Sequence, residues 1–333
     1  MTRAVRLAAI DIGTVTTRLL IADVTDDAVV EVARSTDITN LGEGLTSSGR
    51  LAEAAIGRVS DVIAGYAATI AELDVVRTVA LATSASRDAD NGDELVAALS
   101  ALGVDLQIIG GEREARLSFL GATWSFSGEG ILVVDVGGGS TELIFGSARR
   151  ESSGALRADI DAMRSVDVGS RRITEMFLHA DPPAPAELEA ARAYVADELR
   201  PFFDALRSKP RALVSLAGAA TSLSAINLGL VAYNPDVVHL SCLTGPQLAD
   251  LVATLAALPL IKRREVPGLH PGRAPVIVGG ALVLETVLAL AGLDSTNISE
   301  HDILYGILLD TYRELHRSAD ERLGNGVPVS AWE

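Results

Sequence analysis

The stretch VVDVGGGSTELI, residues 133–144, decides the fold. Apolar residues lead into an aspartate, three glycines follow, and a second apolar segment begins after Ser-Thr-Glu. Valines favour a strand, and glycines reach positive φ, so that backbone N–H groups can converge on an anion. A carboxylate beside an anion site is explained by a divalent cation between them, because Mg²⁺ binds carboxylate, water and phosphate oxygens together. The stretch predicts a β-hairpin that binds phosphate.

A second copy of this pattern occurs near the N-terminus, in AAIDIGTVTTRLLI, residues 8–21. The alignment pairs Asp11 with Asp135, Gly13 with Gly137, Thr16 with Ser140 and Thr17 with Thr141. One copy alone would favour a glycine-rich hairpin without a ligand, whereas two matched copies favour a two-sided phosphate clamp. The copies lie a domain length apart, far more than a solenoid repeat, which indicates a duplicated fold.

The rest of the chain alternates between strand and helix patterns, which is typical of an α/β fold. In the first half we expect strands at about 28–34, 78–82 and 106–109, and helices at 48–73, 93–102 and from 112. In the second half we expect a helix at 186–207, a strand at 212–216 and a strand, turn and helix at 276–293. The apolar segment after each glycine turn excludes a Walker P-loop, which opens a helix. The domain junction is predicted near Ser127 to Gly130.

The amino-acid composition argues against some classes of function. The net charge of −16 over 333 residues argues against binding of a nucleic-acid backbone, which depends on clustered Lys and Arg. One cysteine, Cys242, and no signal-peptide pattern predict a cytoplasmic protein. Residues 212–235 and 276–293 are nearly free of charge, but glycines and polar residues interrupt them, so we interpret them as buried strand–turn–helix units and predict no membrane contact.

Seven motifs in order resemble the exopolyphosphatase / guanosine pentaphosphate phosphohydrolase phosphatase family. They are DIGTVTTRLLI, ATSASRDADN, GGEREARLSFLGA, VVDVGGGSTELI, LVSLAGAATSLSAINLGLVAYNPDVVH, VPGLHPGRAPVIVGGALVL and ISEHDILYGIL. The resemblance implies a short member with two duplicated ribonuclease-H-like domains, of the actin, sugar kinase and chaperone ATPase superfamily, around a central cleft. It implies an N-terminal domain over 1–128 joined by a helix at 300–313, a second domain over 129–299, a tail over 314–333, and a homodimer.

The resemblance also implies roles for individual residues. Glu114 would activate the attacking water, with Glu112 as the runner-up, although a glutamate in a first helical turn ordinarily just complements the helix dipole. Glu142 would be a second acidic catalytic residue, and Arg87 would face the phosphates. Asp135 and Asp11 would bind Mg²⁺ or Mn²⁺. The phosphate-binding residues would be Gly13, Thr14, Thr16, Thr17, Arg18, Gly137, Gly138, Gly139, Ser140 and Thr141.

The chain departs from the family pattern at two places. Val15-Thr16 stands where Asn-Ser is common, and valine cannot donate a side-chain hydrogen bond. Arg113 stands where the family often has an acidic residue, which would add positive charge beside the base. The five histidines have no metal-ligand spacing. His270 is near Lys262, Arg263, Arg264 and Arg273, and this segment is either a basic patch that holds a polyphosphate or a solvated loop.

We therefore expect a Mg²⁺-dependent phosphoanhydride hydrolase that releases terminal phosphate from short-chain polyphosphate, guanosine pentaphosphate or another nucleotide. Two alternatives remain open at this stage. One is a nucleotide-binding phosphotransferase of the same fold, and the other is a non-catalytic regulatory protein. Phosphate release without an acceptor molecule distinguishes the hydrolase from both.

Overall fold

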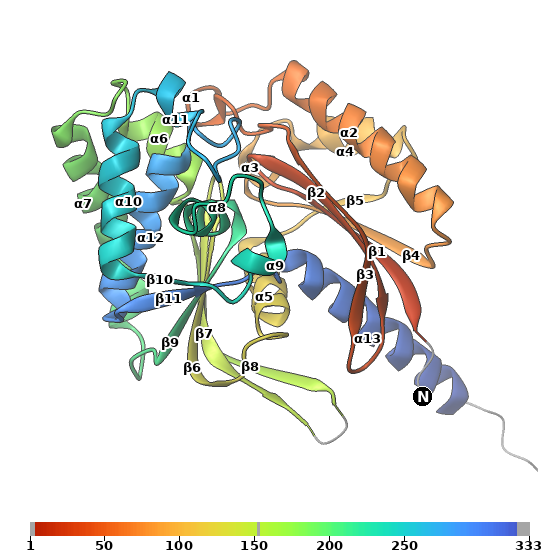
Figure 1. Cartoon of the computed structure of the whole chain (residues 1–333). Helices are drawn as coiled ribbons and strands as arrows, with labels where there is room; N and C mark the ends of the chain where they lie inside the picture. The colour runs from red at the N-terminus through yellow and green to blue at the C-terminus, as the bar shows by residue number, and fades with distance from the viewer. Residues whose placement is uncertain (1–3, 152–153, 325–333) are drawn as a thin grey trace, which may run out of the picture.

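The computed structural model describes residues 4–151 and 154–324, which form two mixed β-sheets (Figure 1). The first sheet has the strand order β3-β2-β1-β4-β5. Its strands are β1 (Val5–Ile12), β2 (Thr16–Val24), β3 (Val29–Ile38), β4 (Arg77–Ala82) and β5 (Leu106–Ile108). The second sheet has the order β8-β7-β6-β9-β11-β10. Its strands are β6 (Gly128–Val136), β7 (Thr141–Arg150), β8 (Leu156–Val166), β9 (Ala212–Leu216), β10 (Cys242–Thr244) and β11 (Ser295–Ile298).

The two sheets repeat one topology. In the first, β1, β2 and β3 pair antiparallel, while β1, β4 and β5 pair parallel. In the second, β6, β7 and β8 pair antiparallel, while β6, β9 and β11 pair parallel, and β10 adds an antiparallel edge. The glycine turns match as well, since Gly13 N donates to Thr16 O at 2.9 Å and Gly137 N donates to Ser140 O at 3.0 Å. The predicted fold, an α/β protein with two duplicated halves of ribonuclease-H-like strand order, is confirmed.

Helices cover the outer faces of both sheets and fill the space between them (Figure 1). Short helices are α1 (Leu45–Ser48), α3 (Ser84–Asp88), α9 (Pro235–Val238) and α11 (Leu260–Arg263). The longer helices are α2 (Glu53–Glu72), α4 (Gly92–Ser100), α5 (Gly111–Ala122), α6 (Ser170–Phe177), α7 (Pro185–Asp204), α8 (Ala217–Asn227), α10 (Gly245–Ala257), α12 (Ile277–Ala291) and α13 (Ile303–Gly324). In Figure 1, α2 and α4 lie beside the first sheet, and α7, α10 and α12 lie beside the second.

Two helices, α5 and α13, pack against each other at the centre of the molecule. Their backbones approach closely because each has a glycine at the crossing. A Cβ built on Gly121 would lie 1.8 Å from the carbonyl oxygen of Asp302, and one built on Gly306 would lie 1.9 Å from that of Leu117. No side chain fits at either position, so these two glycines set the distance between the helices.

The last helix extends further than the sequence predicts. It was expected at 300–313 and extends to Gly324, packing against β1 and β2 as well as α5. The predicted tail over 314–333 is therefore helical as far as 324, and its residues 325–333 lie outside the described part of the chain. The division at 128 stays a prediction, although the first sheet ends at Ile108 and the second begins at Gly128.

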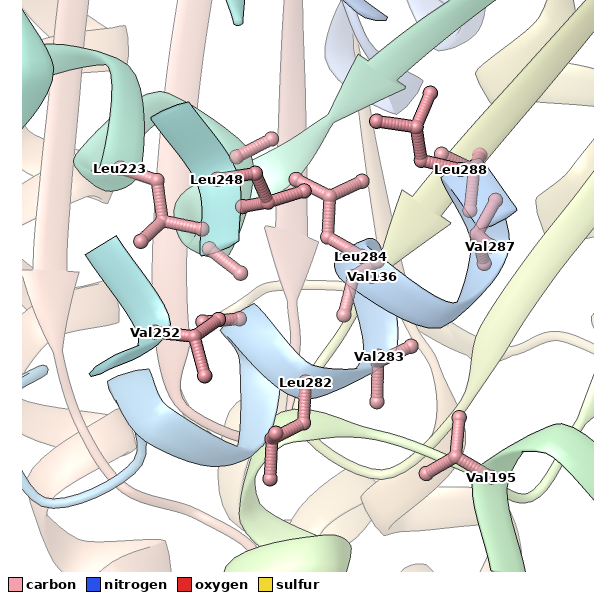
Figure 2. Packing of buried hydrophobic residues seen from close by; sticks show 14 of the residues in the cluster. Val136, Val195, Leu223, Leu248, Val252, Leu282, Val283, Leu284, Val287 and Leu288 are labelled. Atoms are coloured by element: carbon pink, nitrogen blue, oxygen red, sulfur yellow. The ribbon is translucent and has the colours of Figure 1, made fainter. Parts of the chain in front are cut away.

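The core of the second half surrounds α12, where Figure 2 shows Leu282, Val283 and Leu284 among neighbouring apolar side chains. The expected strand at Val276–Val278 was wrong, because α12 begins at Ile277. Tertiary packing overrides β propensity here. A Cβ built on Gly279 would lie 2.4 Å from Ser170 O, so this helical turn sits directly on α6. No helix in the part of the chain that the structure describes is both long and apolar enough to cross a bilayer.

The helix crossing generates a stability prediction. Gly306→Ala places a methyl group against the Leu117 carbonyl, so α5 and α13 must move apart, and overpacking of this kind typically costs about 1–3 kcal/mol. The matched control is Gly57→Ala in α2, where a Cβ meets no atom within 4 Å and the change is expected to stabilise by about 0.5–1 kcal/mol. Urea denaturation measures both. Equal stability of the two variants would contradict the close crossing.

Candidate functional site

The two glycine turns face each other, as the sequence predicts. A Cβ built on Gly138 would lie 2.7 Å from Cβ of Thr14, and one built on Gly139 would lie 2.4 Å from Oγ of Ser84. Only glycine allows the turn after β6 to approach the turn after β1 this closely. The duplication therefore brings two sets of backbone N–H groups and hydroxyls to the same place.

Beside these turns lies a cavity of about 80 Å³, which we call the inner cavity. A single water needs roughly 10–15 Å³ of such space, so the cavity has room for a group of the size of a phosphoryl. It brings together most of the site residues predicted from sequence. Those that border it are Asp11, Gly13, Thr14, Thr16, Arg18, Glu114, Asp135, Gly137, Gly138, Gly139 and Ser140.

Four predicted residues do not border the inner cavity. The hydroxyl of Thr17 lies 3.0 Å from that of Thr39, and the hydroxyl of Thr141 donates to Val168 O at 2.5 Å. Both threonines are thus engaged within the protein. Arg87 and Glu142 stand behind the cavity wall, where they act on groups that do border it.

The carboxylate of Glu114 is held by Arg87. Arg87 Nη1 lies 3.2 Å from Glu114 Oε2 and also donates to Ile109 O at 3.2 Å. Glu114 is buried in the first turn of α5, whereas Glu112, two residues earlier, is exposed and borders a separate shallow pocket. Arg113 is also exposed and donates to Gln107, so its charge does not enter the cavity. Of the two candidate glutamates, the structure places Glu114 at the inner cavity.

Arg18 is partly buried and bridges two carboxylates. Its Nη2 lies 2.5 Å from Asp11 Oδ2, and its Nη1 pairs with Asp302. Asp302 also accepts a hydrogen bond from the backbone N–H of Leu304 at 3.0 Å, so it caps the start of α13. Asp302 lies in the motif ISEHDILYGIL, but no role is predicted for it from the sequence. The signal that could have found it is an acidic residue directly before an apolar helix, a common capping position.

The inner cavity concentrates negative charge. Burial raises the pKa of Glu114 well above its usual range, and the neighbouring Glu142 and Asp135 raise it further. Burial and Asp302 raise the pKa of Asp135 to about 6, although the hydroxyl of Ser118 donates to it at 2.8 Å. Burial and Asp135 raise the pKa of Glu142 to about 8. Ionised carboxylates in this cluster therefore repel one another, and a bound cation would relieve that repulsion.

These residues fit a magnesium ion shared with a substrate. Among the described residues, no group of three or more His, Cys, Asp or Glu is arranged to hold a metal by itself. Mg²⁺ rarely uses such a cage and is usually bound through one or two carboxylates, waters and substrate phosphates. Asp135 and Asp11 both border the inner cavity and meet that requirement.

A larger space of about 640 Å³, the outer chamber, adjoins the inner cavity. The two spaces share four lining residues, which we call the neck: Arg18, Ala217, Gly218 and Arg273. Arg273 is half-buried there, and its guanidinium donates to Gly218 O at 2.9 Å.

The predicted basic patch is only partly assembled. His270 and Arg273 border the outer chamber, whereas Lys262, Arg263 and Arg264 do not. Arg263 is buried and donates to the backbone carbonyls of Leu255 at 2.9 Å and Leu258 at 2.7 Å, so it stabilises the end of α10.

A sequence model of the Ppx/GppA phosphatase family matches residues 20–314. The chain belongs to this family. Exopolyphosphatase 2 of Mycobacterium tuberculosis is 39% identical over 324 residues, which cover 91% of this chain and 98% of that protein. The crystal structure of an exopolyphosphatase-like protein is similar with a TM-score of 0.87 at 34% identity, covering 94% of this chain and 99% of the other. The Aquifex aeolicus PPX-GPPA enzyme follows with a TM-score of 0.76 at 30% identity, covering 92% and 99%.

These similarities confirm the resemblance drawn from the seven motifs. Ppx/GppA proteins are hydrolases of phosphoanhydride bonds, and this chain is a hydrolase of that class. The family match covers both halves of the fold and the second glycine turn, whereas the first turn, at residues 13–16, precedes the matched residues.

The carboxylate cluster generates a pH prediction. The pKa of Glu142 is raised from 4.5 to about 8, so the folded protein holds this proton more tightly than the unfolded chain. Stability from this group is complete below about pH 4.5 and is lost as pH rises to about 8. Glu142→Gln should therefore leave the melting temperature unchanged near pH 4.5 and raise it near pH 9, by at least the roughly 2 °C that about 1 kcal/mol produces at this size. Calorimetry in chelator measures the difference, with exposed Glu112→Gln as the control. A gain that is the same at both pH values would refute the raised pKa.

Proposed function

We propose that this protein is a Mg²⁺-dependent exophosphatase that releases the terminal phosphate from short-chain polyphosphate, from guanosine pentaphosphate, or from both. The observation that carries the proposal is the position of Glu114, a buried carboxylate that borders the inner cavity together with both glycine turns. The names of related exopolyphosphatases support polyphosphate as a substrate. The predicted homodimer and cytoplasmic location stay predictions.

In this proposal the terminal phosphoryl group occupies the inner cavity. Backbone N–H groups of the two turns, with the hydroxyls of Thr14, Thr16 and Ser140, donate hydrogen bonds to its oxygens. Preorganised donors of this kind stabilise the charge that develops on the transferred group. The rest of the substrate passes the neck, where Arg18 and Arg273 add positive charge, and enters the outer chamber.

Glu114 supplies the base. Its carboxylate takes a proton from a water molecule as the water oxygen bonds to the terminal phosphorus and the bridging P–O bond breaks. The bridging oxygen leaves with the shortened chain, and orthophosphate remains in the cavity. Arg87 fixes the direction of the Glu114 carboxylate and favours its ionised form. Glu142 and Ser165 support the same wall, because Ser165 Oγ donates to Glu142 at 2.7 Å.

Asp135 and Asp11 are the residues that would hold Mg²⁺, and Mn²⁺ suits the same ligands. The ion would supply positive charge beside the phosphate oxygens and would lower the repulsion within the carboxylate cluster. Arg18 already neutralises part of the charge on Asp11, so Asp135 is the carboxylate with more negative charge left to share.

The alternatives are less well supported. A phosphotransferase transfers the phosphoryl group to an acceptor molecule, whereas the buried Glu114 with its Arg87 partner supports a base that activates water. A non-catalytic regulator would need neither a buried Glu114 nor its Arg87 partner. Val15 is buried at the inner cavity against Gly138, so it contributes shape there and no hydrogen bond.

Glu114→Gln tests the proposed base. The amide keeps the size of the side chain but cannot take a proton, and general-base catalysis typically contributes roughly 10²–10⁴-fold. Phosphate release from polyphosphate with Mg²⁺ should fall on that order, while substrate affinity, measured by calorimetry, is retained. Glu112→Gln is the matched control and should keep near-normal turnover, because Glu112 is exposed. If Glu112→Gln abolishes turnover and Glu114→Gln does not, the base is assigned to the wrong carboxylate.

Asp135→Asn tests the metal assignment. The change removes the negative charge but keeps an acceptor for Ser118, so the fold should be preserved. Mg²⁺ stimulation of phosphate release should be lost, and the protein should bind Mn²⁺ more weakly by electron paramagnetic resonance. Activity that persists at wild-type level in excess chelator would remove the metal from the mechanism.

A further inference from the structure

A third space lies behind the glycine turns, and we call it the rear cavity. It measures about 220 Å³ and is bordered by Thr46 and Gly49 from the first half and by Arg171 and Arg172 from α6. Thr14, Ser84, Gly138 and Gly139 border both the rear cavity and the inner cavity. A single layer of residues therefore separates the site of the terminal phosphoryl group from a second polar space.

The residues of this layer come from both halves of the molecule. Thr14 and Ser84 belong to the first half, and Gly138 and Gly139 belong to the second. They meet through close packing, with a Cβ built on Gly139 only 2.4 Å from Ser84 Oγ. Within the described residues, no hydrogen bond joins Thr14 or Ser84 to the glycine turn. A path between the cavities at this layer would break no strand pairing and would require the ion pair between Arg172 and Asp88, which joins the two halves there, to separate.

Two arginines bordering the rear cavity could bind an anion. Arg172 Nη2 lies 2.5 Å from Asp88 Oδ2, and its Nε donates to Gly139 O at 2.8 Å, so this guanidinium spans the two halves at the layer. Arg171 is more than nine-tenths buried. Its Nη1 lies 3.4 Å from Glu175 Oε1 and its Nη2 donates to Asn40, whereas its Nε has no hydrogen-bond partner among the described residues. A buried donor without a partner costs stability, and an anion in the rear cavity would provide an acceptor.

Under the proposed function, the substrate chain blocks the front of the site. The inner cavity and the outer chamber share the neck, and the remaining substrate chain lies in the outer chamber. After hydrolysis, orthophosphate is enclosed by the two turns on one side and by that chain on the other. Leaving by the front requires the shortened chain to dissociate first.

We propose that orthophosphate leaves through the rear cavity, between Thr14 or Ser84 and the glycine turn, and that Arg171 and Arg172 bind it there. This inference rests on the proposed function. Its consequence is processive hydrolysis, because the shortened chain stays in the outer chamber and moves forward into the emptied inner cavity.

The test blocks the rear cavity with a large side chain. Thr46 is exposed and borders the rear cavity without touching the inner cavity, so Thr46→Trp fills the exit and leaves the catalytic groups intact. Ser47→Trp is the matched control, since Ser47 is the next residue, is also exposed and does not border the rear cavity. Acid-quenched samples measure bond cleavage in polyphosphate of defined length, and a fluorescent phosphate-binding sensor measures free orthophosphate.

In Thr46→Trp, the first cleavage should keep the wild-type rate, while free phosphate should appear several-fold more slowly. Chains of intermediate length should accumulate, because phosphate now leaves only after the chain dissociates. Ser47→Trp should match the wild type in all three measurements. Free phosphate that appears at the wild-type rate in Thr46→Trp would overturn the exit route.

If Thr46→Trp also slows bond cleavage, Arg171→Gln provides an independent test. Orthophosphate should inhibit this variant only at several-fold higher concentration than it inhibits the wild type, and unchanged inhibition would overturn the anion site. Failure of the proposed function looks different, because the wild type would then cleave no polyphosphate in the quenched samples.

Discussion

The burial of several carboxylates around one small cavity is the constraint on which the rest of the structure depends. The residues are Asp11, Glu114, Asp135, Glu142 and Asp302, and each is at least nine-tenths buried. Such a cluster persists only if cations, hydrogen-bond donors or protons compensate for it. Arg18 and Arg87 supply part of the compensation, and Ser118 and Ser165 supply donors. The remaining negative charge makes the cavity receptive to a cation that accompanies a phosphate.

The fold could be predicted because the duplication is visible as a repeated local sequence pattern. The aspartate, the glycine turn and the following hydroxyls recur in both halves, and the hydrogen bond that closes each turn is the same. Elements that depend on distant packing were harder to predict. The β-branched run before Gly279 has strand propensity but forms the first turn of α12, since only its contact with α6 decides its conformation.

The candidate site, like the fold, could be predicted where the local sequence pattern determines it. Residues in the turns could be assigned from the repeat, and most of them border the inner cavity. Thr17 and Thr141 were assigned by the same logic, yet their hydroxyls bond to Thr39 and Val168, because the direction of a side chain depends on partners far away in the sequence. Asp302 was missed for that reason too. Its partner Arg18 is at the other end of the chain, and no local pattern connects them.

The close crossing of α5 and α13 also fixes two groups of the site relative to each other. Glu114 lies one turn before the crossing on α5, and Asp302 immediately precedes α13 at the same point. Because the glycines leave no room for side chains between the helices, the spacing of the two backbones is set by direct contact of main-chain atoms. The proposed base and the partner of Arg18 are therefore carried by one rigid unit, so that a change in the packing of these two helices would alter both groups together.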